Sequence, residues 1–432
     1  MKKKVLIISY SYPPSNAPAA QRPYAIAKYL DKSRYDVTVL SCSNQDSSLG
    51  FDPSKDNSLK GVKHIEIPAL FGSKMKGVRS ESPGKSKKPS LKGKLMVFLK
   101  HSFGLFMIPD KAVLWVYNVK KALANKSLVV NADLIISTSP LFSNHLLAKY
   151  IVKQNPGVKW IADFRDFHFI KRIDKIPWYL RGIQKSHEAG IIQAATTVTF
   201  ISNSMKEIYE SSYSKEASKF RVVYNGFDFE EYQGVEIKDN ENEKLLSIVY
   251  AGSFHAGERN PKPLFAVLDK ALESGVLVLS ELEIRIAGNI SVKEIETISK
   301  YSSFAAVNFL ELMPRSEIYK LYQETTLLWL IVGERITHYT GVPIKFYEYM
   351  ASRRPIINFA PENAEVSSMI DTSSLGWNFG LKDCDLDENY GKMLSIIQSF
   401  RSKNLLKSLP EKNLKLYDRR EQTKYFEQLI EE

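Results

Sequence analysis

Short apolar runs alternate with amphipathic segments along most of the chain, and this alternation predicts its secondary structure. Each apolar run has the length of a buried strand and ends in small or polar residues. The segments between them carry apolar residues at helical spacing. The predicted strands cover residues 5–9, 35–42, 131–140, 158–168, 194–202, 220–228, 245–253, 282–289, 307–314 and 327–332, and another begins at 356. The predicted helices include residues 21–30, 141–152, 202–210, 263–272 and 315–323.

Strands that alternate with helices in this way form doubly wound parallel sheets, so the sequence predicts the α/β class. The alternation starts again at residue 245, after an acidic low-complexity stretch at 236–244. We therefore expect two Rossmann-like domains, over residues 1–235 and 236–410, and a C-terminal helix at 411–432 that can pack back on the first domain. Because ligands bind at the carboxyl ends of parallel strands, the two domains can face a central cleft.

The sequence lacks the patterns of a dinucleotide-binding turn, a disulfide or zinc site, a signal peptide and a membrane span. The loop after the first strand, residues 10–21, contains no glycine, so it does not predict a dinucleotide-binding turn. Cys42 and Cys384 are the only cysteines and give neither a disulfide framework nor zinc-ligand spacing, which favours a reducing cytoplasm. The apolar run at 5–8 is too short for a signal peptide, and no run of about 18 apolar residues predicts a membrane span.

Positive charge is concentrated in the first half of the chain. Residues 1–234 hold 36 lysines and arginines against 19 acids, whereas the remainder holds 24 against 29. Residues 73–100 carry nine of these cations and one acid, and we expect this segment to be mobile. The apolar stretch 95–109 follows, and a basic segment before an apolar one is typical of a surface that binds an anionic membrane. A mobile insertion before a core helix explains the pattern equally well.

Nucleic acid is not expected as a partner. The basic stretch 74–94 has no interleaved aromatic residues, and the sequence contains no recognised nucleic-acid-binding module.

Polar residues that follow the predicted strands are the candidates for a functional site. Lys345 and Glu348 lie three apart near the start of a predicted helix and therefore share one face. A helix N-terminus suits a phosphate, and Glu348 could accept hydrogen bonds from sugar hydroxyls. A solvated Lys–Glu pair in an ordinary strand–loop–helix connection is the alternative. The other candidates are Asn16, Arg22, His145, Asp163, Arg165, Asp166, Gly252, Ser253 and Arg259.

Two of these candidates have structural alternatives, and so does an acidic stretch near the C-terminus. Arg165 could simply form an internal salt bridge with a neighbouring aspartate, since charges at a buried strand end are costly unless they are paired. His145, on an apolar helix, is typical of a structural histidine. The acidic stretch 383–388 lacks the glycine and the terminal glutamate of a calcium loop, so we expect a solvated turn and no metal.

Motifs in a fixed order indicate a family. They are SYPPSNAPAAQRPYAIAKYL, then PD and Trp115, LIISTSP, IADFRD, VYNGFD, AGSF and GVPIKFYEYMASRRPI. In this order they resemble the retaining glycosyltransferases of the GT-B fold, and the chain is similar to glycosyltransferase family 4 and its bacterial polysaccharide-synthesis members. The resemblance covers nearly the whole chain.

The resemblance implies roles for individual residues. Lys345 would contact the diphosphate of a nucleotide-sugar donor, Glu348 the nucleotide ribose, and Arg259 would complete the diphosphate clamp. Two cations and a helix N-terminus would replace a metal, so no cofactor is expected. Gly252 and Ser253 belong to the same donor side. Catalysis would fall to Arg165, Asp166 and Asp163 of the IADFRD motif, and Asn16, Arg22 and His145 would lie on the acceptor side.

The implied function is transfer of a sugar, with retention, to a lipid-linked or polysaccharide acceptor in cell-surface glycan synthesis. The protein would be cytoplasmic and peripheral on the inner membrane face. The chain departs from the family pattern at Thr340, where many members have a glutamate, at Phe167-His168, and at residues 16–19. Because of these departures, a second hypothesis stays open: the protein could be a non-catalytic relative of these enzymes that acts as a partner protein or as a nucleotide-sugar sensor. A sugar-nucleotide epimerase would not explain the basic first domain.

Overall fold

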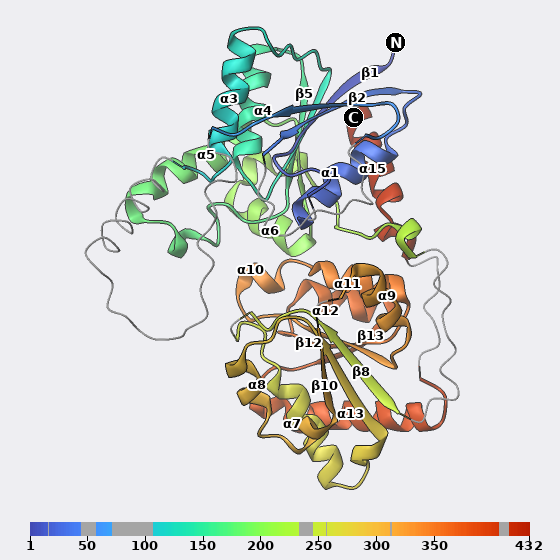
Figure 1. The fold of residues 1–432 in the computed structure, drawn as a ribbon. Coiled ribbons are helices and arrows are strands. Elements are labelled where there is room, and N and C mark those ends of the chain that lie inside the picture. Colours follow the sequence, from blue (N-terminus) through green and yellow to red (C-terminus); the bar gives the residue numbers. More distant parts are fainter. Residues whose placement is uncertain are drawn as a thin grey trace, which may run out of the picture. The chain divides into compact units, whose positions relative to one another are not determined.

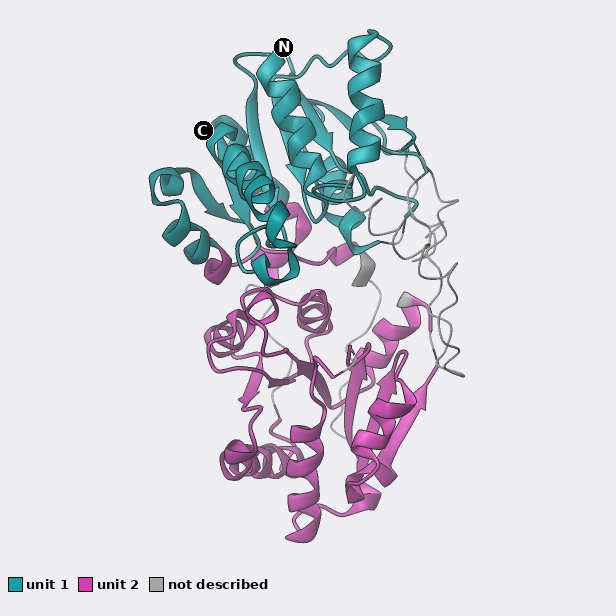
Figure 2. Cartoon of the chain, turned by 90° about the vertical axis from the view of Figure 1, so that its left-hand side faces the viewer, with its two compact units in different colours: residues 1–201, 206–223, 423–432 teal, residues 202–205, 224–422 magenta. Residues whose placement is uncertain are grey.

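The computed structural model describes residues 1–15, 17–44, 58–70, 107–232, 245–255, 257–311, 313–405 and 414–432. Asn16, the basic segment 73–100 and the acidic stretch 236–244 lie outside the described residues. The chain divides into two compact units, coloured separately in Figure 2. Unit 1 comprises residues 1–201, 206–223 and 423–432, and unit 2 comprises residues 202–205 and 224–422.

Unit 1 contains a seven-stranded parallel sheet in the order β3-β2-β1-β4-β5-β6-β7. Val5 of β1 lies beside Val37 of β2 and Leu134 of β4, so the first strand is central. The order reverses between β1 and β4, which is where doubly wound sheets bind ligands. The strands are β1 (Lys3–Ile8), β2 (Tyr35–Cys42), β3 (Val62–Ile67), β4 (Leu134–Thr138), β5 (Lys159–Phe164), β6 (Thr197–Phe200) and β7 (Phe220–Val222).

Helices cover both faces of this sheet. Figure 1 shows α3 and α4 on one face and α1 and α15 on the other. On the second face Val5 and Ile7 of β1 form a core cluster with Ile26 of α1 and with Phe426 and Leu429 of α15. The helices with residues in unit 1 are α1 (Pro18–Tyr29), α3 (Val113–Ala124), α4 (Ser143–Gln154), α5 (Arg181–Ala194), α6 (Asn203–Ser212) and α15 (Arg419–Glu431).

Unit 2 repeats the topology with a six-stranded parallel sheet in the order β10-β9-β8-β11-β12-β13. Its first strand in sequence, β8, is again central, and the order reverses between β8 and β11. The strands are β8 (Leu246–Ala251), β9 (Leu282–Ala287), β10 (Val307–Leu310), β11 (Leu327–Ile331), β12 (Ile356–Phe359) and β13 (Gly376–Phe379). Two doubly wound α/β units therefore confirm the predicted fold class.

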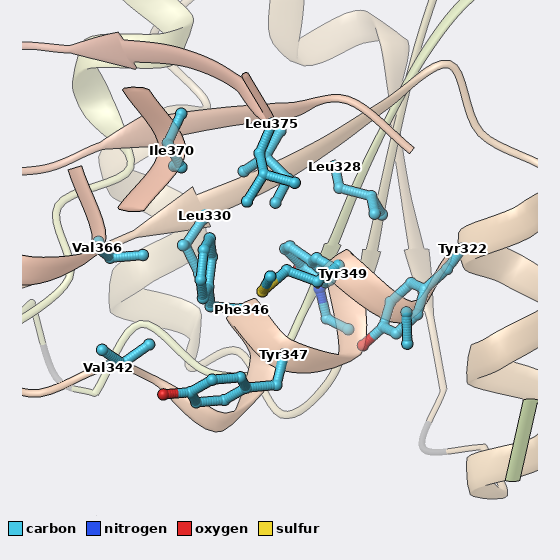
Figure 3. Close-up of a cluster of buried hydrophobic side chains, with 14 of the residues drawn as sticks. Tyr322, Leu328, Leu330, Val342, Phe346, Tyr347, Tyr349, Val366, Ile370 and Leu375 are labelled. Atoms are coloured by element: carbon cyan, nitrogen blue, oxygen red, sulfur yellow. The ribbon is translucent and has the colours of Figure 1, made fainter. Parts of the chain in front are cut away.

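Alternate residues of β8 serve two separate cores in unit 2. Ile248 belongs to the cluster that α7 and α13 cover, whereas Val249 belongs to the cluster beneath α9, α11 and α12. Figure 3 shows this second cluster, which includes Phe346, Tyr347 and Tyr349 of α11. The helices are α7 (Lys262–Glu273), α8 (Val292–Ile298), α9 (Arg315–Gln323), α10 (Ile336–Tyr339), α11 (Ile344–Ser352), α12 (Glu365–Ser373) and α13 (Leu386–Arg401).

The structure adds details that the pattern did not predict. Strand β3 was missed because its sequence, VKHIEI, is too polar to stand out as an apolar run. Helix α1 begins at Pro18, three residues before its predicted start, because proline needs no N–H partner in the first turn. No helix among the described residues is long and apolar enough to cross a bilayer.

Candidate functional site

Helix α11 places Lys345 and Glu348 near the carboxyl end of β8. Tyr349, one residue after Glu348, is fully buried and fixes the helix to two strands. Its hydroxyl donates a hydrogen bond to the Trp329 carbonyl of β11 at 3.1 Å and accepts one from the backbone N–H of Ala251, the last residue of β8, at 3.4 Å. The packing of α11 against the strand ends therefore determines where Lys345 lies.

A gap left by glycine accommodates the Lys345 side chain. Nζ lies 5.1 Å from the centre of the Tyr250 ring, and a side chain at Gly252 would overlap Nζ. Gly252 has a φ of +140°, which residues with a side chain rarely adopt. A side chain at Gly288, which follows β9, would in turn overlap the Gly252 carbonyl. Two adjacent strands thus end without side chains, and the lysine occupies the space.

Lys345 and Arg259 form a concentration of positive charge. Burial, and after it the positive charge of Arg259, lower the pKa of the Lys345 ammonium to about 7, although the negative charge of Glu348 acts in the opposite direction. Arg259 Nη1 donates a hydrogen bond to the Ser253 carbonyl at 3.4 Å. Within the described ranges, neither cation forms a salt bridge with an acid. Two close cations with a lowered lysine pKa favour the binding of an anion.

Glu348 lies one turn beyond Lys345 and is partly exposed. The Tyr322 hydroxyl of α9 donates to Glu348 Oε2 at 3.4 Å. The carboxylate can therefore accept hydrogen bonds from hydroxyl groups of a ligand as well. The structure brings together five predicted residues at this strand end: Gly252, Ser253, Arg259, Lys345 and Glu348.

Thr340 stands at the position where the resembled family often has an acid. It is buried, and its hydroxyl donates a hydrogen bond to the Ile336 carbonyl at 2.5 Å. The side chain thus bonds back to the first residue of the short helix α10, which Thr340 follows. Nearby, Glu258 forms a salt bridge with Arg335 at 2.5 Å, and His338 Nε2 lies 3.5 Å from Glu258 Oε2, so the loop after β8 contacts the region of α10.

Asp163 in unit 1 lies at the centre of a buried polar network. It is fully buried and accepts hydrogen bonds from Arg22 Nη2 at 3.0 Å and from the hydroxyls of Thr138 and Thr199 at 2.8 Å each. Arg22 Nη2 also donates to the Val223 carbonyl at 2.9 Å. Asp163 therefore forms an internal salt bridge with Arg22, whereas the sequence had offered Arg165 for such a pair. In this structure Asp163 and Arg22 support the sheet and have almost no surface for a substrate.

Arg165 and Asp166 follow β5 and differ in exposure. The Arg165 guanidinium donates to the carbonyls of Pro18 and Ala19 at 3.2 and 3.1 Å, and Ser139 Oγ accepts from its backbone N–H at 2.6 Å. Arg165 is buried and thereby holds the start of α1 against the end of β5. Asp166 is exposed, so it is the member of the IADFRD group that can contact a ligand.

His145, which the sequence assigned to the acceptor side, lies in the interior of unit 1. Its ring is fully buried, and burial lowers its pKa to about 3. Its Nδ1 lies 2.7 Å from Ser137 Oγ, which accepts a hydrogen bond from Trp160 Nε1 at 2.8 Å. Phe142 and Phe164 pack around the imidazole. The structure therefore shows His145 of α4 packed in the interior, with no exposed ring atom to contact a substrate.

The acidic stretch 383–388 is engaged with neighbouring residues. Asp385 Oδ2 accepts from the Lys382 N–H at 2.9 Å, Asp387 pairs with Lys270, and Glu388 pairs with Lys392 at 2.7 Å. Among the described residues, no three His, Cys, Asp or Glu side chains are grouped to hold a metal ion.

Sequence reasoning missed residues that support the candidate sites. Tyr250 could have been found, because it lies in the last two residues of β8, directly before Gly252. Nothing in the sequence around Tyr322 predicts its contact with Glu348, because only the packing of α9 against α11 brings the two residues together. The same holds for Thr138 and Thr199, which reach Asp163 from neighbouring strands.

No protein-family model matches the sequence, and no curated protein matches it either. Solved structures do resemble it over the whole chain. Sucrose-phosphate synthase from Thermosynechococcus elongatus has a TM-score of 0.63 at 13% identity, covering 100% of this chain and 98% of the other. WaaG, a glycosyltransferase involved in lipopolysaccharide biosynthesis, has a TM-score of 0.54 at 12% identity, covering 98% and 94%.

The same fold also occurs in a candidate UDP-N-acetylglucosamine 2-epimerase from Listeria monocytogenes, with a TM-score of 0.56 at 11% identity, covering 100% of this chain and 96% of the other. At such low identity these likenesses show the fold and not the reaction. Together with the two parallel sheets, they show that the chain has the GT-B fold of two Rossmann-like domains.

Proposed function

We propose that the protein is a glycosyltransferase that transfers a sugar from a nucleotide-sugar donor to a lipid-linked or polysaccharide acceptor. The observation that carries the proposal is the cation pair of Lys345 and Arg259 beside Gly252, at the carboxyl end of β8. The order of the sequence motifs and the GT-B fold support it. The fold alone does not, because a candidate epimerase shares it.

In this proposal the donor diphosphate binds to Lys345 and Arg259 and to the N-terminus of α11. The ribose hydroxyls bind to the Glu348 carboxylate, which Tyr322 orients. As the glycosidic bond breaks, its electron pair passes to the diphosphate, and the two cations stabilise the charge that develops there. The same cations would perform the neutralisation for which other glycosyltransferases use a metal, so we propose no metal or other cofactor.

The reaction would proceed with retention at the anomeric carbon. The acceptor hydroxyl forms the new bond on the face that the diphosphate leaves, and its proton passes to the departing phosphate oxygen. No protein nucleophile is then required. Asp166, which is exposed, would contact the reacting sugars, whereas Arg165 would position the loop before α1 through its bonds to Pro18 and Ala19. Asp163 would act only by positioning Arg22.

We place the protein in the cytoplasm, peripheral on the inner membrane face, in the synthesis of a cell-surface glycan. The support for this is the excess of positive charge in the first half of the sequence, because an anionic lipid surface attracts such charge. The acceptor would bind to unit 1, where Asn16 and the basic segment remain candidates from the sequence.

A second candidate is a non-catalytic protein that senses nucleotide sugars. One observation favours it: at a position where family members often have a glutamate, the Thr340 hydroxyl donates a hydrogen bond to the Ile336 carbonyl of α10. Such a protein would bind a donor but release no nucleoside diphosphate.

The test combines binding with turnover. Calorimetry with a panel of nucleotide sugars identifies the donor, and release of nucleoside diphosphate is then measured with a lipid acceptor. We expect Lys345→Ala and Glu348→Ala to reduce release about 10²–10³-fold while the protein stays folded. Lys300→Ala, an exposed lysine in the same unit, is the control. Near-normal turnover in either site variant contradicts the site, and an epimerised nucleotide sugar among the products contradicts transfer.

A further inference from the structure

An ordered segment of unit 1 presents large apolar side chains to solvent. It comprises residues 171–185, which follow β5 and run into the first turn of α5. Within it Trp178 is 79% exposed, Tyr179 and Ile183 are each 47% exposed, and Ile173 is 39% exposed. Contiguous exposed apolar residues are uncommon on soluble proteins and mark interaction surfaces. We call residues 171–185 the Trp178 segment.

Buried contacts hold the base of this segment in place. Glu188 of α5 is fully buried and accepts hydrogen bonds from the Phe169 N–H at 2.8 Å and from the hydroxyls of Tyr209 and Tyr213 at 3.0 and 3.1 Å. Arg181 Nε donates to the Ile176 carbonyl at 3.1 Å, which closes the turn that carries Trp178. In Figure 1 the green chain before α5 projects away from the sheet of unit 1. The exposed apolar side chains therefore belong to a segment whose ends are anchored to unit 1 by hydrogen bonds.

The charges of the segment indicate what it binds. It contains five basic residues, Lys171, Arg172, Lys175, Arg181 and Lys185, and one acid, Asp174. All of these basic residues except Arg181 are exposed. Tryptophan and tyrosine prefer the boundary between lipid headgroups and acyl chains, and lysine and arginine are attracted to anionic headgroups. One short segment combines both preferences.

We propose that the Trp178 segment docks unit 1 on an anionic lipid surface. Trp178, Tyr179 and Ile183 would enter the headgroup region, and Lys171, Lys175 and Lys185 would contact lipid phosphates. A stable protein partner is a poorer match, because such interfaces bury about 800 Å² on each side and have few charges at their centre. The apolar residues here lie among cations.

This inference extends the membrane part of the proposed function to residues that the structure describes. The sequence had suggested the basic stretch 73–100 for that role, and the Trp178 segment is separate from it. The experiment below uses no sugar donor. A negative result would therefore contradict the docking surface but not the transfer reaction. Normal lipid binding by a protein without transferase activity would contradict the transfer reaction but not the docking surface.

Tryptophan fluorescence of the full-length chain provides the test. Of the five tryptophans, Trp115, Trp160 and Trp329 are fully buried and Trp377 is partly buried, so Trp178 is the one that can respond most to lipid. Vesicles of phosphatidylcholine alone are compared with vesicles that also contain phosphatidylglycerol, with and without bromine-labelled acyl chains. We expect a blue shift and bromine quenching only with phosphatidylglycerol, and both should be absent in Trp178→Phe.

Variants separate the apolar and charged contributions. In vesicle co-sedimentation we expect Trp178→Ala, and separately Lys175→Gln with Lys185→Gln, to weaken binding, the latter about fivefold for each lost charge. Val292→Ala, an apolar residue 73% exposed on unit 2, and Lys293→Gln with Lys300→Gln are the matched controls and should bind as wild type.

Two outcomes overturn the proposal. One is lipid binding that is unchanged in Trp178→Ala and in the lysine pair, which would assign the membrane contact elsewhere in the chain. The other is a loss of self-association in Trp178→Ala, measured by sedimentation, with no lipid binding in the wild type, which would make the segment a protein interface. Circular dichroism of each variant verifies that the fold is retained.

Discussion

Lys345 and Gly252 share one space: the Nζ atom of the lysine lies where a side chain at position 252 would begin. The two residues are 93 positions apart in the numbering and come from different βα units. Because this contact depends on the lack of a side chain, it connects a backbone feature of β8 with the charge that we assign to donor binding.

Gly252→Ala should therefore impair binding without removing any ligand-contacting group. The added methyl group displaces Lys345 Nζ, and we expect donor affinity to fall about 10- to 100-fold, as for the loss of a charged hydrogen bond. Gly275→Ala is the control, since Gly275 also has a positive φ of 69° but no atom lies within 4 Å of its added methyl. A donor affinity in Gly252→Ala equal to that of the control would contradict the assigned role of the Lys345 position.

The pH dependence of donor binding should follow the lowered pKa of Lys345. That pKa is about 7 because of burial and Arg259, so the lysine loses its proton above this pH and its attraction for a diphosphate weakens. Calorimetry between pH 6 and 9 should show affinity falling by up to about tenfold per pH unit above 7. In Arg259→Gln the decline should begin at a higher pH, because a neighbouring positive charge is gone. A pH-independent affinity would contradict the assignment.

Stability without donor should change in the opposite direction. Between about pH 7 and the ordinary lysine pKa, the unfolded chain binds a proton at residue 345 that the folded chain does not. The free energy of unfolding from this group therefore rises with pH over that range. Urea unfolding of wild type and Lys345→Met at a series of pH values isolates the effect, and parallel curves would contradict it.

Tyr349 should influence the donor site without touching the donor. Tyr349→Phe removes the hydroxyl that joins Trp329 to Ala251 and leaves two buried groups with one partner fewer. We expect a loss of about 1–3 kcal/mol in the free energy of unfolding, and weaker donor binding because α11 is held less firmly. Tyr390→Phe, which loses an exposed bond to Ser274, is the control. A destabilised variant with unchanged affinity would refute the link.

Asp163 and Asp166 should separate stability from activity. Asp163→Asn leaves Arg22 buried without its counter-charge, so we expect a loss of about 3–5 kcal/mol in urea unfolding. Asp166→Asn changes an exposed side chain, so stability should stay within about 0.5 kcal/mol while turnover falls. The reverse pattern would assign catalysis to Asp163.

Local sequence pattern predicted most of the fold because buried parallel strands are short and uniformly apolar. The strands β1, β8 and β11 are of this kind, and their apolar runs stood out. Strand β3 was missed because VKHIEI alternates with charged residues, and α5 because its apolar residues are widely spaced. The start of α1 was misplaced because proline is favoured in the first turn of a helix, and the spacing of apolar residues does not reveal this preference.

The grouping of the candidate donor-side residues at one strand end could be predicted because each follows a strand or begins a helix within a recognisable motif. Their partners could not. Tyr322 meets Glu348 only through helix packing, and Arg22 meets Asp163 across 141 positions of sequence. The burial of His145 and Asp163 likewise follows from tertiary packing, so the sequence left structural and catalytic roles open for both.

Calorimetric titration of the wild-type protein with a panel of nucleotide sugars tests the central claim most directly, with Lys345→Ala and the exposed-lysine variant Lys300→Ala measured alongside. We predict that one donor binds to the wild type and to Lys300→Ala with the same affinity, and that Lys345→Ala binds it about 10- to 100-fold more weakly. Binding of that donor to Lys345→Ala with wild-type affinity, or no binding of any nucleotide sugar to the wild type, would contradict the account.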